Sequence, residues 1–503
     1  HVRQNADRKR SIPHHIKGVN SLKLFDLMKN VPFTGITENL EISRVTSDSR
    51  QITPGCLFVC IAGARFDGHS AAEQVLKEGA AAVVCERDLG LDQQLLVEDS
   101  REAYGILCSN FYGNPAQKMK LIGITGTNGK TTCTYLIKHI LESAGKKVGL
   151  IGTIHNEIGD MVLPAKNTTP DPGELHVLFM RMAQAGCEYV VMETSSHALD
   201  QKRLAGCRFA VGVFTNLTQD HLDYHGTMEN YYQAKKKLFD LSDAAVINID
   251  DEYGRRLTQE IPCPAITFSI HTDTADFTAK DIRPTVDRNR FTIVGNAQIG
   301  RVSFSMPGEF SVANAMAAGV TTLMLGLDMQ QVCDGLSSCP GIPGRTEVLH
   351  TDTDFTVIRD YAHTPDGLEK VLPALKPFVK NRLMVLFGCP GERDPSKRIH
   401  MAEAVAKYAD YIILTSDNPR REDPIQIIKQ ALPGLAGASV PYEVIPDRYT
   451  AIEWGLSHAQ PGDVLVLAGK GHEDYQVLGY GTIHFDEKEV VARLLTELQE
   501  NRK

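Results

Sequence analysis

Residues 121–132 read LIGITGTNGKTT, an apolar run followed by a glycine-rich turn that leads into Lys130 and Thr131. The apolar run predicts a buried strand, and the residues from Lys130 to about Ala144 have the pattern of an amphipathic helix. Backbone N–H groups of such a turn suit phosphate oxygens, and so does the positive end of the helix dipole. Lys130 can reach the β- and γ-phosphates of a nucleotide, and the Thr131 hydroxyl suits Mg²⁺.

This turn is shorter than the usual Walker loop, because Ile124 stands where that pattern has glycine. The plainer interpretation is an ordinary strand–turn–helix connection. Strand, turn, lysine and threonine together favour phosphate binding. On the loop alone, the chain could be a kinase, an ATPase or a ligase.

Apolar runs alternate with helical stretches along the chain, which is typical of α/β architecture. The predicted strands are Cys56–Ile61, Ala81–Val84, Leu121–Thr125, Tyr189–Met192, Val211–Phe214, Ala245–Ile249, Phe355–Arg359, Leu383–Phe387, Tyr411–Leu414 and Val464–Ala468. The stretch Cys339–Arg345, CPGIPGR, has two prolines and two glycines and indicates an interdomain hinge. We expect three α/β domains: a small one at 19–110, a central one at 111–340 with a parallel sheet around the phosphate loop, and a Rossmann-like one at 341–503.

The composition limits the class of protein. Over 503 residues the chain is 42% hydrophobic and 23% charged, with a net charge of −9, which is the balance of a globular protein and not of a general nucleic-acid binder. No apolar run approaches the roughly 18 residues of a membrane span, and His1–Gly18 lacks the apolar core of a signal peptide. The 11 cysteines are scattered singly without a CxxC pair. We expect a cytoplasmic monomer without nucleic-acid or membrane partners.

Polar residues follow two of the predicted strands. Glu193 comes directly after the strand YVVM, where a carboxylate beside a phosphate loop can bind Mg²⁺, although it could also be an ordinary polar strand end. His221 follows the next strand, and a histidine there is more often structural or capping than a magnesium ligand. The run Lys235–Lys237 would ordinarily be a solvated helix face.

Five segments in this order resemble the Mur ligases of peptidoglycan synthesis. They are GTNGKTT at 126–132, NTTPD at 167–171, ETSSH at 193–197, NLTQDHLDYHG at 216–226 and YYQAK at 231–235. The resemblance runs from about Leu22 to Leu495. It implies an ATP- and magnesium-dependent ligase that adds meso-diaminopimelate to UDP-N-acetylmuramoyl-L-alanyl-D-glutamate through an acyl phosphate. A ligase that adds L-lysine, a folylpolyglutamate-type ligase, and a kinase or ATPase are the alternatives.

The resemblance also implies roles for single residues. The ATP contacts are Gly126, Thr127, Asn128, Gly129, Lys130, Thr131, Thr132, Asn314, Arg345 and Asp360. The magnesium ligands are Thr131, Glu193, His221 and Lys235, the last as a carbamate, and the catalytic residues are Lys130, His221 and Lys235. Adding CO₂ to a lysine replaces an ammonium with a carboxylate, whose oxygens suit Mg²⁺. The chain departs from the family at Ser311, where an asparagine is frequent.

The two other substrates have implied contacts of their own. Those of the UDP-linked precursor are Ser47, Ser49, Ala64, Arg65, Phe66, Asn167, Thr168, Thr169, Ser195, Gln201 and Arg203, although plain helix capping would explain several of the serines and threonines. Those of the amino acid are Arg393, Asp417, Asn418, Pro419, Arg420, Gly469 and Glu473. On its own, DNPR at 417–420 reads as a turn. In the family it marks addition of diaminopimelate, whose second carboxylate a guanidinium can bind through two hydrogen bonds. Around Arg393 the chain reads CPGERD and KRI, where the family usually has CGGDRD and KRP.

Overall fold

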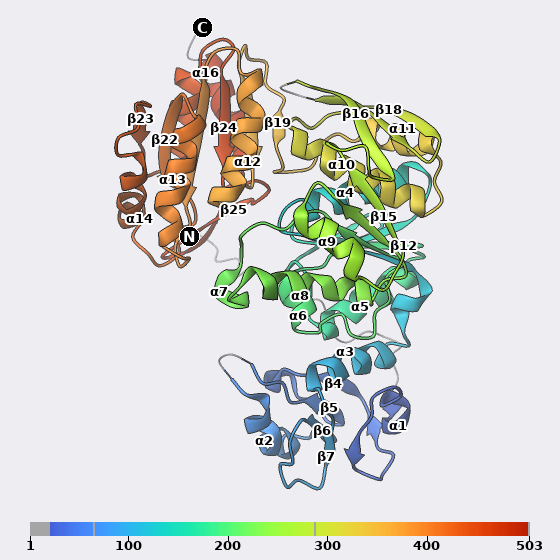
Figure 1. Cartoon of the computed structure of the whole chain (residues 1–503). Helices are drawn as coiled ribbons and strands as arrows, with labels where there is room; N and C mark the ends of the chain where they lie inside the picture. The colour runs from blue at the N-terminus through green and yellow to red at the C-terminus, as the bar shows by residue number, and fades with distance from the viewer. Residues whose placement is uncertain (1–20, 64–65, 286–287, 501–503) are drawn as a thin grey trace.

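The structure, a computed structural model, describes residues 21–63, 66–285 and 288–500. Three large sheets follow one another along the chain, each with its own helices (Figure 1). This arrangement confirms the predicted α/β class with three domains, whereas the boundaries at 110 and 340 stay a prediction. Ala64, Arg65 and the segment His1–Gly18 lie outside the described residues.

The N-terminal sheet has the order β2-β7-β6-β5-β4. Its strands are β2 (Thr34–Gly35), β4 (Arg44–Thr46), β5 (Cys56–Val59), β6 (Ala82–Cys85) and β7 (Gln94–Leu96). β5 and β6 are buried along their whole length, as expected for strands covered on both faces. Helix α2 (Ala72–Lys77) joins these two strands, and α3 (Ser100–Phe111) lies against the central domain in Figure 1.

The middle of the central sheet is parallel. Its strands, in spatial order, are β9 (Val148–Ile151), β12 (Tyr189–Glu193), β8 (Lys120–Thr125), β13 (Val211–Phe214), β14 (Ala245–Asn248), β15 (Ala265–Ser269) and β16 (Phe277–Pro284). β8 lies between β12 and β13, so the carboxyl ends of these three strands meet at one edge of the sheet. The phosphate loop follows β8 at that edge.

The prediction of a parallel central sheet is confirmed for its middle strands, but it did not include the antiparallel strands at both ends. Antiparallel strands complete it: β10 (His155–Ile158), β11 (Met161–Pro164), β17 (Asn289–Gly295) and β18 (Gln298–Phe304). These strands are more exposed than the parallel ones: no residue of β11 is buried, and the first five residues of β17 alternate between buried and more exposed positions. In β10, β17 and β18 polar residues interrupt the apolar runs on which the prediction depended.

Helices cover both faces of the central sheet. On one face lie α4 (Lys130–Ser143), α10 (Glu309–Met324) and α11 (Met329–Ser338), which share one apolar core. On the other lie α5 (Pro172–Gln184) and α8 (Met228–Asp240), which share a second. α4 begins at the phosphate loop, as predicted, so the amino end of a long helix faces that loop.

The C-terminal sheet has the order β19-β20-β24-β21-β22-β23, parallel except for β19. Its strands are β19 (Glu347–Leu349), β20 (Thr356–Asp360), β21 (Leu383–Cys389), β22 (Tyr411–Ser416), β23 (Tyr442–Val444) and β24 (Val464–Ala468). Helices α12 (Pro365–Leu375), α13 (Ser396–Tyr408) and α14 (Pro424–Ala431) cover one face, and α15 (Arg448–His458) and α16 (Glu487–Glu500) the other. This is the doubly wound arrangement that the Rossmann-like prediction describes, in which ligands bind at the carboxyl ends of the strands.

Within the described part of the chain, no helix has the length and apolar character needed to cross a membrane. All eleven cysteines are free thiols, and ten of them are buried.

Candidate active site

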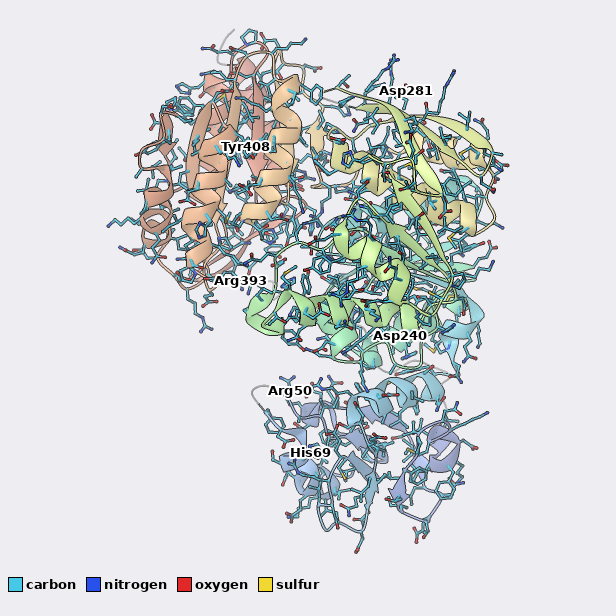
Figure 2. The ribbon with its side chains drawn as sticks, viewed as in Figure 1. Arg50, His69, Asp240, Asp281, Arg393 and Tyr408 are labelled. Carbon is cyan, nitrogen blue, oxygen red and sulfur yellow. The ribbon has the colours of Figure 1, made fainter. Side chains whose placement is uncertain are left out.

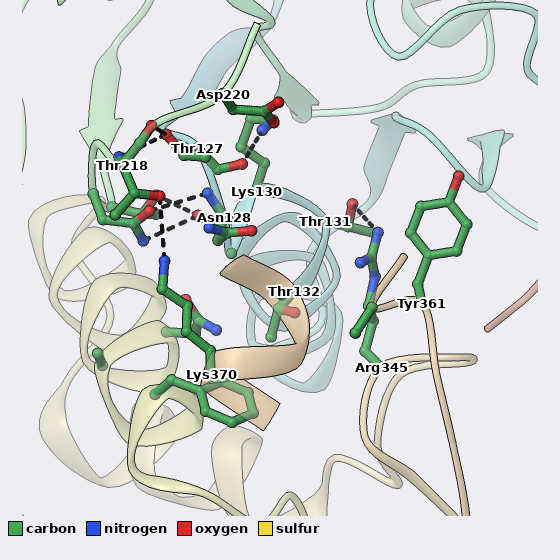
Figure 3. Close-up of a pocket in the computed structure, with 18 of the residues that line it drawn as sticks. Thr127, Asn128, Lys130, Thr131, Thr132, Thr218, Asp220, Arg345, Tyr361 and Lys370 are labelled. Atoms are coloured by element: carbon green, nitrogen blue, oxygen red, sulfur yellow. Dashed lines mark hydrogen bonds between the residues drawn. The ribbon is translucent and has the colours of Figure 1, made fainter. Parts of the chain in front are cut away.

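A cavity of about 820 Å³ lies between the central and C-terminal domains. The predicted site residues that line it are Thr127, Asn128, Gly129, Lys130, Thr131, Thr132, Thr168, Glu193, Ser195, His221, Lys235, Asn314, Arg345, Asp360 and Arg393. We call it the interdomain cavity. It brings together segments that are far apart in the sequence, and Figure 3 shows residues of both domains around it.

The phosphate loop fits closely against the chain that follows β13. A Cβ atom on Gly126, whose φ is +146°, would lie 1.9 Å from Thr215 Oγ1, so only glycine fits there. Thr127 N–H donates to Asn216 O at 2.8 Å, and Thr215 Oγ1 donates to Asn128 O at 2.6 Å. The loop is therefore fixed by the neighbouring strand end before any ligand binds.

Lys130 folds back onto its own loop. Its Nζ donates to Gly126 O and Thr127 O, both at 2.9 Å. Burial lowers the pKa of Lys130, and the Glu193 carboxylate partly offsets that effect. An ammonium held beside the loop backbone is placed to meet phosphate oxygens.

Glu193 is the last residue of β12 and is 1% exposed. Its Oε1 accepts from Thr131 Oγ1 at 3.0 Å and from Thr153 N–H at 2.8 Å, and its Oε2 accepts from Thr153 Oγ1 at 3.0 Å. The sequence interpretation missed Thr153, a threonine just after β9 that no motif marks. From the C-terminal side, Arg345 Nη2 donates to Thr131 Oγ1 at 3.2 Å.

The three lysines of the KKK run have different surroundings. Lys235 is 2% exposed, and its Nζ donates to Gly126 O at 2.7 Å. Burial lowers the pKa of Lys235 well below its ordinary value, and the charge of Lys130 lowers it further. Lys236 instead pairs with Glu260 at 3.0 Å and Lys237 with Asp200 at 2.8 Å, both with their side chains partly in solvent. The interpretation of a solvated helix face therefore fits Lys236 and Lys237, whereas Lys235 is buried.

His221 has a left-handed backbone, with φ +53°, just before the short helix α7 (Leu222–His225). Its side chain makes no capping hydrogen bond, so the capping interpretation is not supported. The His221 ring lies between the rings of His197 and Tyr231, at centroid distances of 4.9 and 6.1 Å. Among the residues that the structure describes, no three His, Cys, Asp or Glu side chains gather as a metal site. Glu193 and His221 are therefore too few ligands to hold Mg²⁺ by themselves. The Thr131 hydroxyl, a carbamate on Lys235 and phosphate oxygens can supply the further oxygen ligands.

Asn314 and Ser311 occupy different places on α10. A Cβ atom on Gly129 would lie 2.3 Å from Asn314 Oδ1, so Asn314 borders the end of the phosphate loop. Ser311 is fully buried, and its hydroxyl donates to Pro307 O at 2.7 Å. Asn314, and not Ser311, therefore lines the interdomain cavity.

The C-terminal domain also contributes residues that the sequence interpretation missed. Asp366 Oδ2, at the start of α12, accepts from Asn128 Nδ2 at 2.8 Å and from Thr218 Oγ1 at 3.1 Å. Lys370 Nζ, one turn later, lies 3.0 Å from the same oxygen, and Figure 3 shows it pointing towards Thr218. Because 238 residues separate Asp366 from Asn128, no local pattern could have linked them.

Two further predicted residues from this domain have polar contacts. The Arg345 guanidinium lies 4.7 Å from the Tyr361 ring centroid, and its buried Nε has no hydrogen-bond partner among the described residues. Asp360 accepts from the N–H groups of Thr346 at 2.6 Å and Ala362 at 2.7 Å. Burial raises the pKa of Asp360, while Arg345 acts in the opposite direction.

A second group of predicted residues gathers where β22 and β24 end. We call it the strand-end cluster: it consists of the predicted residues Asp417, Asn418, Pro419, Arg420, Gly469 and Glu473, together with Lys470, which was not predicted. Asn418 Nδ2 donates to Glu473 Oε2 at 2.8 Å, and Lys470 Nζ donates to Asn418 Oδ1 at 3.2 Å. The fully buried Lys470 was missed, although it stands inside the GKGHE segment.

Two buried polar atoms of the strand-end cluster lack a hydrogen-bond partner among the described residues: Asp417 Oδ2 and Arg420 Nε. A Cβ atom on Gly469, whose φ is +116°, would lie 2.7 Å from Asp417 Oδ2, so a larger residue would close off that oxygen. Arg393, by contrast, is exposed and lines the interdomain cavity, on the side of the C-terminal domain that faces the central one (Figure 2).

The predicted precursor contacts fall into two places. Near the cavity, Arg203 Nη1 donates to Thr169 O at 2.9 Å, and Arg203 Nη2 donates to Gln201 Oε1 at 2.8 Å. Thr169 Oγ1 in turn donates to Glu193 O at 2.7 Å. Asn167 is exposed just before them. The other group, Ser47, Ser49 and the 56% exposed Phe66, belongs to the N-terminal domain and does not line the cavity. Ser195 also accepts from Ala198 N–H at 3.3 Å, the capping role given as the alternative.

Comparison with known proteins gives the class of the chain. Three family models match it: "Mur ligase family, catalytic domain" over residues 41–112, "Mur ligase middle domain" over 124–322, and "Mur ligase, glutamate ligase domain" over 344–471. The chain therefore belongs to the Mur ligase family and is an ATP-dependent ligase that forms amide bonds. The resemblance expected from the five motifs is confirmed.

Several relatives match nearly the whole chain, and two of them illustrate the likeness. It is 45% identical to UDP-N-acetylmuramoyl-L-alanyl-D-glutamate–2,6-diaminopimelate ligase 1 of Clostridium acetobutylicum, over 92% of this chain and 96% of that one. It is 46% identical to UDP-N-acetylmuramoyl-L-alanyl-D-glutamate–2,6-diaminopimelate ligase of Caldanaerobacter subterraneus subsp. tengcongensis, over 95% of this chain and 99% of that one. A solved structure of a UDP-N-acetylmuramoyl-L-alanyl-D-glutamate–2,6-diaminopimelate ligase aligns with a TM-score of 0.71 at 33% identity, over 95% of this chain and 99% of that chain.

Proposed function

We propose that the chain joins meso-diaminopimelate to UDP-N-acetylmuramoyl-L-alanyl-D-glutamate, using ATP and Mg²⁺. The observation that carries this proposal is the strand-end cluster, where a buried carboxylate oxygen of Asp417 and a buried guanidinium nitrogen of Arg420 both lack partners among the described residues. Buried polar atoms normally have hydrogen-bond partners, so two unpaired atoms on side chains of opposite charge mark a place for a zwitterionic ligand.

Diaminopimelate is lysine with a second carboxylate at its far end. Asp417 and Glu473 suit an ammonium group, and Arg420 suits a carboxylate through paired N–H donors. With lysine in the same place, the Arg420 guanidinium would face no anion. Sites with a buried polar partner reject analogues that lack the matching group, by roughly 10⁴-fold in strong cases.

The interdomain cavity is proposed to bind ATP and the reacting carboxylate of the precursor. Lys130 and Arg345 would meet the phosphates, and Asn314 would lie near the base. Thr131, Glu193, His221 and Lys235 as a carbamate would hold Mg²⁺, which supplies charge neutralisation on the transferred phosphoryl group. There the precursor carboxylate would attack the γ-phosphate of ATP and release ADP. The amine of the incoming amino acid would then attack the acyl carbon and displace inorganic phosphate.

The two proposed binding places share one edge of the C-terminal sheet. Asp360 ends β20 and lines the interdomain cavity, while Asp417 and Gly469 follow β22 and β24. Because these strands are parallel, their carboxyl ends lie at the same edge. An amino acid held in the strand-end cluster is therefore on the side of the domain from which it can reach the acyl phosphate.

Ser47, Ser49, Ala64, Arg65 and Phe66 are proposed to hold the uridine end of the precursor. Asn167, Thr168, Thr169, Ser195, Gln201 and Arg203 would hold its sugar, diphosphate and peptide. We further place the enzyme in the cytoplasm as a monomer, without nucleic-acid or membrane partners. The eleven free thiols agree with a reducing compartment.

The test is mass spectrometry of the products formed from UDP-N-acetylmuramoyl-L-alanyl-D-glutamate, ATP and Mg²⁺ with single amino acids. The amino acids are meso-diaminopimelate, L-lysine and L-glutamate, each at the same low concentration. We expect a product whose mass increases by diaminopimelate less water, together with release of ADP and phosphate. Equal yields with lysine would contradict the amino-acid assignment, and phosphate release without any ligated product would contradict the proposed reaction.

A further inference from the structure

A single buried guanidinium lies at the base of the strand-end cluster. Arg448, the first residue of α15, is 1% exposed. Its Nη1 donates to Ser416 O at 3.2 Å, and its Nη2 donates to Ala468 O at 2.9 Å. Its Nε donates to Glu487 Oε1 at 2.8 Å, in an ion pair whose two side chains are both fully buried.

The two carbonyl groups belong to the last residues of two separate strands. Ser416 ends β22 and Ala468 ends β24, and β21 lies between these strands in the sheet. No backbone ladder therefore joins β22 to β24 directly. The Arg448 guanidinium makes that connection across the intervening strand.

The residues that follow these carbonyls are those of the strand-end cluster. Asp417 and Asn418 follow Ser416, while Gly469 and Lys470 follow Ala468. Their side chains also meet, since Lys470 Nζ donates to Asn418 Oδ1 at 3.2 Å. The two segments are thus tied at their base by Arg448 and at their side chains by the bonds among Asn418, Lys470 and Glu473.

A buried ion pair is a poor way to gain stability. Desolvation of two charges largely cancels their attraction, and apolar residues of similar volume often stabilise a core as well or better. Here Glu487 Oε2 also lacks a hydrogen-bond partner among the described residues. The planar, forked guanidinium offers something that an apolar side chain does not, namely fixed donors to two carbonyl oxygens at once.

We propose that Arg448 is a positioning residue that fixes the spacing between the Asp417–Asn418 and Gly469–Lys470 segments, and with it the fit of the incoming amino acid. The inference rests on the proposed function, in which these segments bind that amino acid. It adds a determinant of affinity and selectivity that does not itself touch the substrate.

The test compares Arg448→Lys with a matched control, Arg382→Met. Lysine keeps the charge but cannot reach both carbonyls and Glu487 with one rigid fork. Arg382 pairs with the buried Asp463 at 2.6 Å just before β21 and β24, at the opposite edge of the same sheet. Both variants lose an arginine contact within the domain, but only the first lies under the strand-end cluster.

In Arg448→Lys we expect the KM for meso-diaminopimelate to rise about tenfold or more, because small misplacements of binding groups are costly. The KM values for ATP and for the precursor should stay within about twofold of wild type, and preference over L-lysine should fall. Arg382→Met should lower Tm without changing these ratios. Should Arg448→Lys fold poorly, Glu487→Gln removes the charge of the partner and keeps the carbonyl contacts, and it should give the same pattern more weakly.

The proposal is overturned if Arg448→Lys and Glu487→Gln change Tm as Arg382→Met does and leave the KM for the amino acid unchanged. Failure of the proposed function looks different, because the wild-type enzyme would then ligate another amino acid. In that case the same KM comparison, made with the amino acid that is actually used, still decides the role of Arg448.

Discussion

The interdomain cavity and the strand-end cluster position their polar groups in different ways. In the cavity, the contacts that close the site cross a domain boundary, as between Arg345 and Thr131 at 3.2 Å and between Asp366 and Asn128 at 2.8 Å. In the strand-end cluster, every contact described lies within the C-terminal domain, and those from Lys470 to Asn418 and from Arg448 to Ala468 are buried.

This difference suggests separate functions for the two places: the chemical step in the interdomain cavity and amino-acid binding in the strand-end cluster. A site whose groups meet only when two domains approach can be assembled by domain closure on the bound substrates. Such closure excludes water during the chemical step. A binding place built within one domain can hold its ligand at any domain arrangement. We therefore expect changes in the cavity to reduce turnover or ATP affinity, and changes in the strand-end cluster to alter amino-acid affinity and selectivity.

The largest effect is expected for Lys235→Ala. The variant removes the proposed carbamate and with it an oxygen ligand of Mg²⁺, so ligation should fall by about 10³-fold or more, the scale seen when a preorganised charge-stabilising group is lost. Added bicarbonate should not restore it. Steady-state ligation rates check this result, and mass spectrometry of the intact wild-type protein should show the added CO₂ where the carbamate survives ionisation.

The neighbouring lysines provide the control. Lys236→Ala and Lys237→Ala each remove a lysine from the same helix but only break partly exposed ion pairs with Glu260 and Asp200. Such solvent-screened pairs contribute little, so activity should stay within roughly a few-fold of wild type. Near-normal ligation by Lys235→Ala would contradict the proposed role of this lysine.

Lys130→Ala should come next, with a loss of roughly 10²–10³-fold in kcat, since one preorganised donor to the reacting phosphate disappears. In the structure this ammonium bonds to carbonyls of its own loop, Gly126 O and Thr127 O, and not to a core group. The fold should therefore persist. Circular dichroism and Tm measured beside the ligation rate check this, and a loss of activity that only follows unfolding would contradict the assignment.

The sequence predicted much of the cavity because its parts are local motifs at strand ends. LIGIT, YVVM and VGVF run parallel in adjacent positions, so GTNGKTT, Glu193 and the segment after Phe214 had to meet at one edge. Two kinds of feature could not be predicted: residues that reach the cavity from the other domain, and strands whose residues alternate in polarity. Asp366 and Lys370 approach only through the domain arrangement, and β17 and β18 alternate in polarity where continuous apolar runs were sought.

The strand-end cluster was predicted less completely, for a related reason. DNPR and GKGHE could be assigned to it by resemblance, but their support comes from far along the chain. Gln476 donates to Asp417 O at 2.7 Å across 59 residues, and Arg448 joins two strand ends that are not adjacent. Neither residue stands in a motif, so only the folded chain identifies them.

A smaller and more selective effect is expected for Arg420→Ala. Truncating one partner of a buried charge pair costs about 2–5 kcal/mol in binding, so kcat/KM for meso-diaminopimelate should fall by roughly 30-fold or more. The value for L-lysine, which has no second carboxylate, should change little, so most of the preference disappears. Competition between the two amino acids measures this directly. Arg421→Ala, beside it in the sequence, is the control, and an unchanged preference in Arg420→Ala would contradict the amino-acid assignment.

The smallest effect is expected at Asp366, one of the residues whose contacts join the two domains. Asp366→Asn keeps the shape of the side chain but removes the charge that accepts hydrogen bonds from Asn128 and Thr218. Hydrogen bonds of this kind contribute about 0.5–1.5 kcal/mol each, so the KM for ATP should rise by roughly 3–10-fold. Since Asp366 does not touch the strand-end cluster, the KM for the amino acid should stay unchanged, which sets this variant apart from Arg420→Ala.

Glu369→Gln is the matched control for that last variant. Glu369 lies on the same helix, three residues further along, and its charge faces Lys407 of its own domain at 3.6 Å. Because that pair does not cross the domain boundary, its loss should leave the KM for ATP unchanged. If both Asp366→Asn and Glu369→Gln leave the KM for ATP unchanged, the contact between Asp366 and the phosphate loop does not contribute to nucleotide binding. If only Asp366→Asn raises the KM for ATP, docking of the C-terminal domain is part of how the phosphate loop holds its nucleotide.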